Sequence, residues 1–107
     1  MPDRELGPVL ETLRQELDRL LGDRLHGLVL FGSRARGDAL LDSDVDLLVV
    51  INGEFDYSDL LRRTSHITSR VSLEHDIVVS RTFVHRERFE NGQTPFLMNV
   101  RRESVAV

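Results

Sequence analysis

The chain has 107 residues, of which 40% are hydrophobic and 30% charged, and its net charge is -4. This is the composition of a globular protein with room for one core, so we expect a single domain over residues 1–107. The absence of cysteine excludes disulfides and thiolate chemistry, and the absence of lysine excludes Schiff bases and a phosphate-loop lysine. No apolar run approaches the roughly 20 residues that span a bilayer, which predicts a soluble cytoplasmic protein without a membrane contact. The negative charge predicts no direct nucleic-acid binding.

The first half of the chain contains one amphipathic stripe and two apolar runs. Leucine and valine recur every three or four positions, which predicts a helix from about Leu6 to Leu21, and Gly22 fits its C-terminal end. Two apolar runs then predict strands, from about Leu25 to Phe31 and from about Val45 to Ile51. A polar loop separates the two strands.

In the second half, a helical stripe that Asp56 or Ser58 could cap predicts a helix ending at about Ser72. A short strand is expected at about Leu73 to Val79. The spacing of apolar residues supports a helix in Thr82 to Glu90 only weakly.

Near the C-terminus, Thr94 and Pro95 form a good helix start, with threonine as the cap and proline at the first helical position. The side chains expected to face inward from this helix are Phe96, Leu97 and Val100. Residues Ser104 to Val107 predict a last short strand. The element order predicts an α/β (α+β) domain, with a small mixed β-sheet that carries helices on one face and leaves the other open.

The polar loop, GSRARGDALLDSDVD from Gly32 to Asp46, contains the candidate chemistry. Asp44 and Asp46 lie two residues apart at the start of the second strand. The period of a strand sends both carboxylates to one face, while Val45 and Leu47 point to the other. One face can therefore hold a divalent metal while the other joins the core.

Three known loop types fail to match these residues. A Walker loop needs Lys-Ser/Thr where this chain has Asp38-Ala39, and a calcium-binding EF-hand needs a glycine where this chain has Leu47. The dinucleotide fingerprint Gly-x-Gly-x-x-Gly is absent. Taken alone, Asp42, Ser43 and Asp44 could also form a plain polar turn.

The glycine-serine pair and the aspartates together are more specific than the aspartates alone. Gly32-Ser33, ten further residues, and then Asp44-Val45-Asp46 opening an aliphatic strand resemble the signature of the DNA polymerase β-like nucleotidyltransferase superfamily. The segment GSRARGDALLDSDVDLLVV is similar to the corresponding segment of its minimal nucleotidyltransferase branch. The resemblance spans nearly the whole chain. It implies a nucleotidyltransferase (polymerase β-like palm) fold.

The resemblance also implies roles for individual residues. Gly32 and Ser33 would bind the triphosphate of ATP, with Arg36, or less favoured Arg34, as a phosphate contact, although either arginine could be a solvated loop charge. Asp44 and Asp46 would hold two Mg²⁺ ions. The family's third carboxylate matches Asp76, which would hold the ion nearest the attacking hydroxyl and take its proton; Glu74 is its rival. Asp42 and Ser43 are expected to shape the loop.

The implied function is Mg²⁺-dependent transfer of AMP from ATP to a hydroxyl. Chains of this kind and size pair with helical HEPN ribonuclease toxins, modify a toxin tyrosine and act as antitoxins, which implies a possible hetero-oligomer. Two alternatives remain: a module that neutralises its partner by contact alone, and an enzyme for a small-molecule hydroxyl such as that of an aminoglycoside. Relatives often end in Glu-Gly and a short strand, whereas this chain has Glu103-Ser104, which places the last turn in question.

Overall fold

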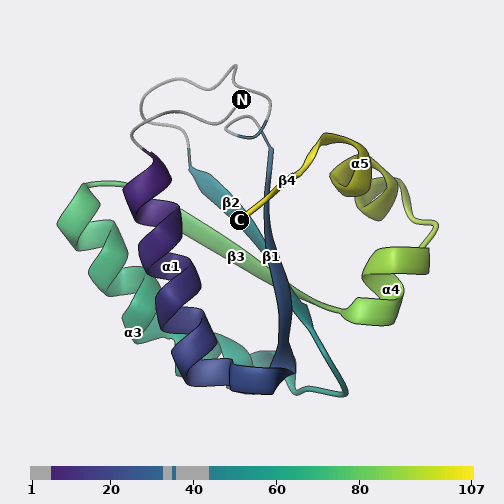
Figure 1. The fold of residues 1–107 in the computed structure, drawn as a ribbon, viewed down its shortest axis with the longest axis horizontal. Helices are drawn as coiled ribbons and strands as arrows, with labels where there is room; N and C mark the ends of the chain where they lie inside the picture. Colours follow the sequence, from purple (N-terminus) through teal and green to yellow (C-terminus); the bar gives the residue numbers. More distant parts are fainter. Residues whose placement is uncertain (1–5, 33–34, 36–43) are drawn as a thin grey trace.

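The computed structural model describes residues 6–32, 35 and 44–107, and these form a four-stranded sheet with helices packed against both faces (Figure 1). The helices and strands in chain order are α1 (Leu6–Leu21), the short 3-10 helix η1 (Gly22–Arg24), β1 (Leu25–Phe31), β2 (Val45–Ile51), α3 (Tyr57–His75), β3 (Val79–His85), α4 (Arg86–Asn91), α5 (Pro95–Glu103) and β4 (Val105–Ala106).

The sheet is small and mixed, as expected. Its strand order is β3-β2-β1-β4. The central strand β2 is antiparallel to β1 and parallel to β3, and β4 pairs antiparallel with β1. Because β2 and β3 are parallel, both begin at the same edge of the sheet. That edge is where the chain leaves the polar loop.

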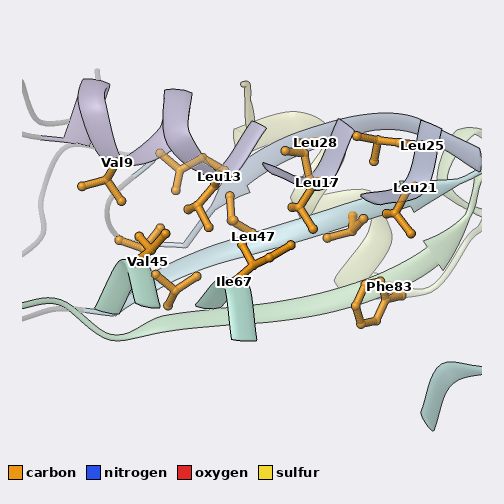
Figure 2. Close-up of a cluster of buried hydrophobic side chains, with 14 of the residues drawn as sticks. Val9, Leu13, Leu17, Leu21, Leu25, Leu28, Val45, Leu47, Ile67 and Phe83 are labelled. Atoms are coloured by element: carbon orange, nitrogen blue, oxygen red, sulfur yellow. The ribbon is translucent and has the colours of Figure 1, made fainter. Parts of the chain in front are cut away.

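The main core lies between the sheet and the pair α1 and α3, which cover one face side by side (Figure 1). Figure 2 shows Leu13 and Leu17 of α1 pointing toward Leu47 of β2, with Ile67 of α3 closing the cluster from below. The leucine stripe of α1 is buried at three- and four-residue steps, which confirms the predicted helix and its boundaries.

The other face of the sheet is not open, which corrects one prediction. Leu48 and Val50 of β2 pack there against Leu97 and Val100 of α5, with Val84 of β3. The continuous apolar run of β2 explains this, because a strand with apolar residues at consecutive positions needs cover on both faces. Phe96 was expected to face inward but keeps 47% of its surface exposed, with its ring edge-on to Phe31 at a centroid distance of 5.5 Å.

The third strand was predicted too early. Helix α3 continues to His75, Asp76 ends it in the left-handed conformation, and β3 begins only at Val79. The Ile77 N–H donates to the Ser72 carbonyl at 3.1 Å, which closes the helix with a turn where the sequence had suggested a strand. The weakly helical segment 82–90 divides into the end of β3 and the short helix α4.

The predicted helix starts are confirmed in detail. Asp56, one of the two candidate caps, accepts a hydrogen bond from the Asp59 N–H at 3.1 Å, and Thr94 accepts one from the Leu97 N–H at 3.3 Å. Ser104 adopts an extended conformation with φ -76°, which needs no glycine, and β4 follows it. Within the described ranges, no helix is long and apolar enough to cross a membrane.

Candidate active site

Strand β2 positions the two aspartates of the signature. Asp46 lies in β2 between Phe31 of β1 and Ser80 of β3, and Asp44 immediately precedes the strand. Asp46 is half-buried and Asp44 is exposed. Val45 and Leu47 belong to the core under α1 and α3, so the alternation predicted from the sequence places the Asp46 carboxylate on the opposite face, the one that α5 partly covers.

Gly32 closes the site from the β1 side. Its φ of +78° is a conformation that side chains rarely adopt, and a Cβ built on it would lie 2.5 Å from Oδ2 of Asp46. The Gly32 carbonyl also accepts a hydrogen bond from the Ala35 N–H at 3.1 Å, which tightens the turn after β1. The backbone conformation therefore favours glycine here, and a Cβ would also displace the Asp46 carboxylate from its position.

The electrostatics of the Asp44 and Asp46 carboxylates favour binding of a cation. Burial raises the pKa of Asp46 above its usual range, and the neighbouring Asp44 carboxylate raises the pKa further. Each effect makes the ionised form of Asp46 less favourable, and a bound divalent cation would offset both. Two carboxylate oxygen donors at a partly open position suit Mg²⁺, which prefers oxygen ligands and keeps several waters.

Asp76 lies at the same edge of the sheet but at the end of a helix. The Val45 N–H donates to the Val78 carbonyl at 2.8 Å, so the start of β2 is fixed beside the segment that follows Asp76. Among the described residues, however, no group of three or more His, Cys, Asp or Glu side chains is arranged to hold a metal ion. The structure thus joins Gly32 with Asp46 and leaves the third-carboxylate role of Asp76 a prediction.

The rival third carboxylate, Glu74, lies in the last turn of α3 and not on a strand, with a side-chain oxygen 4.0 Å from Nε of Arg70. The other loop residues with predicted roles lie outside the described residues: Ser33, Arg34, Arg36, Asp42 and Ser43. Their assignments remain predictions.

Sequence reasoning missed two hollows on the face that Asp46 shares. One of about 200 Å³ is lined by Gly32, Phe31, Phe96 and Asn99. A larger one of about 580 Å³ lies further along the strands, with Leu48, Thr82 and again Phe96 in its wall. The exposed aromatic Phe96 was the available signal, but its helical spacing had assigned it to the core.

Comparisons with known proteins identify the family of this chain. The model of the nucleotidyltransferase domain family matches residues 10–104. A protein of Methanocaldococcus jannaschii named for an inferred protein adenylyltransferase activity is 34% identical over 76 residues, which cover 71% of this chain and 76% of that protein. A second protein with that name from the same organism is 44% identical over 50 residues, 47% of this chain, so the match spans only 34% of that relative.

Two solved structures share the fold. One is an inferred nucleotidyltransferase of Sulfolobus solfataricus, with a TM-score of 0.59, 21% identity and coverage of 99% of this chain and 87% of that one. The other is a toxin–antitoxin with AMP-PNP, with a TM-score of 0.61, 19% identity and coverage of 90% of this chain and 70% of that one.

The fold is the α/β fold of polymerase β-like nucleotidyltransferases. More specifically, this chain belongs to the nucleotidyltransferase domain family and is an enzyme of that type.

Proposed function

We propose that this protein transfers AMP from ATP, with Mg²⁺, to a hydroxyl on a partner protein, and that the acceptor is a tyrosine of a helical HEPN-type ribonuclease toxin that the transfer silences. The names of the M. jannaschii relatives support protein adenylylation, and the fold shared with a toxin–antitoxin bound to AMP-PNP supports the antitoxin context. The partner would form a hetero-oligomer with this chain in the cytoplasm.

One observation carries the proposal: the half-buried Asp46 carboxylate lies against the backbone of Gly32 and next to Asp44. A nucleoside triphosphate needs close backbone approach and cationic neutralisation, and this arrangement offers the first and attracts the second. A polar turn with no chemical role would not need a glycine whose missing side chain makes room for a carboxylate.

The proposed reaction is an in-line displacement at the α-phosphorus of ATP. The acceptor hydroxyl oxygen forms a bond to the α-phosphorus of ATP, the bond from that phosphorus to the bridging oxygen breaks, and pyrophosphate leaves. Asp76 takes the hydroxyl proton, while Ser33 and Arg36 bind the triphosphate oxygens. Asp44, Asp46 and Asp76 would hold Mg²⁺, which would supply neutralisation of the charge that develops in the reaction. A tyrosine hydroxyl is a weak nucleophile near neutral pH, so it needs this activation.

The test uses the protein, Mg²⁺, α-labelled ATP and the helical protein encoded by the adjacent gene. We expect label on a tyrosine of that protein and release of pyrophosphate. The variant with both Asp44→Asn and Asp46→Asn should lose the label by at least about a thousandfold, because it lacks the ligands of the metal.

The same variant separates transfer from neutralisation by contact. Toxin activity that stays blocked by the double variant, without any label, would favour a contact-neutralising module. Labelling of a small-molecule hydroxyl without any protein partner would favour the small-molecule enzyme.

A further inference from the structure

The larger hollow lies on the face of the sheet that carries Asp46, a short distance along the strands from that carboxylate. Leu48 of β2 and Thr82 of β3 line it, and they follow Asp46 and Ser80 by two residues on their strands. Two residues along a strand span about 6.6 Å. The hollow therefore begins one side-chain pair away from the proposed site of transfer.

The walls of this hollow are aromatic. Tyr57 and Phe83 meet edge to face with centroids 5.3 Å apart, and Phe55 packs beside both rings. Phe96 of α5 forms the wall shared with the smaller hollow beside Gly32. A volume of about 580 Å³ with such a lining matches the usual size and character of a ligand site.

Two large apolar side chains at this hollow are exposed to solvent. Five large ones are exposed in the described part of the chain: Tyr57, Leu73, Val78, Phe96 and Met98. Tyr57 and Phe96 line the hollow itself. Val78 lies just before β3 on the face of Ser80 and Thr82, beside the start of β2. The exposed rings of Tyr57 and Phe96 at the hollow are characteristic of a surface that a partner covers.

One positive charge borders the hollow. Arg88 of α4 is exposed and lines it, and over the described ranges its guanidinium makes no hydrogen bond or ion pair, whereas Arg86 on the same helix pairs with Glu90 at 2.8 Å. An uncompensated guanidinium beside an apolar hollow complements a carboxylate flanking an apolar side chain.

We infer that this hollow, formed by β3, α3, α4 and α5, is the acceptor-docking site: it holds a large apolar or aromatic side chain of the partner protein about two residues from the hydroxyl that receives AMP, with a partner carboxylate facing Arg88. The inference rests on the proposed function and adds what that function lacks, a feature that selects the acceptor. An extended segment advances about 3.3 Å per residue, so an anchor in the hollow brings the hydroxyl two residues away to Asp46.

The first experiment fills the hollow with Thr82→Phe and uses Thr12→Phe, the same change at a half-exposed position of α1, as the matched control. Initial rates of labelling of the adjacent-gene helical protein give KM and kcat. We expect Thr82→Phe to raise the acceptor KM about tenfold or more with kcat nearly unchanged, and Thr12→Phe to leave both at wild-type values. The Kd of a non-hydrolysable ATP analogue with Mg²⁺ should stay within about twofold of wild type for both variants.

The second experiment reverses the charge with Arg88→Glu, which leaves the packed aromatic wall intact, and compares it with Arg19→Glu, whose side chain is 77% exposed on α1. Arg88→Glu should raise the acceptor KM about threefold to tenfold in low salt, with a smaller effect at high salt, and Arg19→Glu should not.

The outcomes separate the two proposals. If the wild-type protein labels no tyrosine, the proposed function and the docking site fail together. If wild-type transfer is efficient but both hollow variants keep the wild-type acceptor KM, the docking site alone is wrong. A weakened analogue Kd in Thr82→Phe with an unchanged acceptor KM assigns the hollow to the nucleoside and also overturns the docking site.

Discussion

At the scale of single residues, two features of the candidate site lower the stability of the folded protein. Asp46 is half-buried beside another carboxylate, which raises its pKa, and Gly32 adopts a left-handed conformation to make room for it. Neither feature contributes to the core. Both are understandable if the site is shaped for a cation and a phosphate chain and not for the stability of the metal-free protein.

The raised pKa of Asp46 predicts that Asp46→Asn stabilises the metal-free protein. A carboxyl whose folded-state pKa exceeds its unfolded value binds its proton more tightly when folded, so the folded state loses stability as the pH rises through these values. In EDTA, the melting temperature of Asp46→Asn should exceed that of wild type by a few degrees at pH 7. The gap should close as the pH falls to about 3 and below, where the carboxyl of the wild type is largely protonated in both the folded and the unfolded state. A gap that widens in acid would contradict the raised pKa.

Alanine variants at three glycines can distinguish the cost of backbone strain from the cost of steric contact. Gly32 and Gly53 share φ +78°, but only Gly32 has a neighbour within reach of a new Cβ, and Gly27 has neither feature. Urea unfolding should therefore rank the losses Gly32→Ala, then Gly53→Ala, then Gly27→Ala. We expect about 1–2 kcal/mol for Gly53→Ala, more for Gly32→Ala, and within about 0.5 kcal/mol of wild type for Gly27→Ala. Equal losses at Gly32 and Gly53 would remove the contact with Asp46 from the explanation.

At the scale of elements, the Arg81 side chain makes two hydrogen bonds that link β3 to α3. Arg81 donates from Nε to the buried Thr64 hydroxyl and from its terminal nitrogen to the Leu61 carbonyl, both at 2.7 Å. Burial lowers the pKa of Arg81, but the two hydrogen bonds satisfy the charge. This junction fixes the strand that borders Asp46.

Replacement of Arg81 should weaken that junction. Arg81→Met keeps the aliphatic part of the side chain and removes two charge-assisted hydrogen bonds, so we expect a loss of about 1–3 kcal/mol in chemical denaturation. The control is Arg62→Met on α3, where the arginine side chain is 78% exposed. This change should alter the free energy of unfolding by less than about 0.5 kcal/mol. A comparable loss in both variants would show that Arg81 contributes no more than a surface arginine.

The sequence predicted some elements well and others poorly for physical reasons. The amphipathic stripe of α1, the two apolar strands and the caps Asp56 and Thr94 depend on local spacing and local hydrogen bonds, which a sequence displays directly. The start of β3 depends on where α3 stops, and the left-handed turn at Asp76 has no glycine to mark it. The apolar pattern therefore predicts a strand through Ile77 and Val78, whereas β3 begins only at Val79.

For the candidate site, the spacing of Gly32, Asp44 and Asp46 predicted a common location, and the structure brings Gly32 and Asp46 together. The hollows could not be foreseen, since they depend on α5 packing across the second face of β2. Phe96 belongs to the same helical stripe as Leu97 and Val100, and only the crossing of α5 over Phe31 decides that its ring borders a cavity.

At the scale of the whole molecule, ligand binding should offset the costs concentrated at one edge of the sheet. Mg²⁺ with a non-hydrolysable ATP analogue at about 100 times its Kd should stabilise the fold by about 2.7 kcal/mol, which corresponds to a rise of about 10 °C in Tm for a chain of this size. Chelation by EDTA should remove the rise. The Asp44→Asn, Asp46→Asn protein should show no such rise, and an equal rise in that variant would place the nucleotide elsewhere.

The backbone conformation of Asp76 has a cost for folding. It is the single non-glycine residue with a positive φ in the described ranges, and it stands at the helix end where glycine is usual. A glycine there would relieve a backbone cost of about 1 kcal/mol. Asp76→Gly should therefore raise the stability of the fold, so the carboxylate at this position is not explained by folding alone.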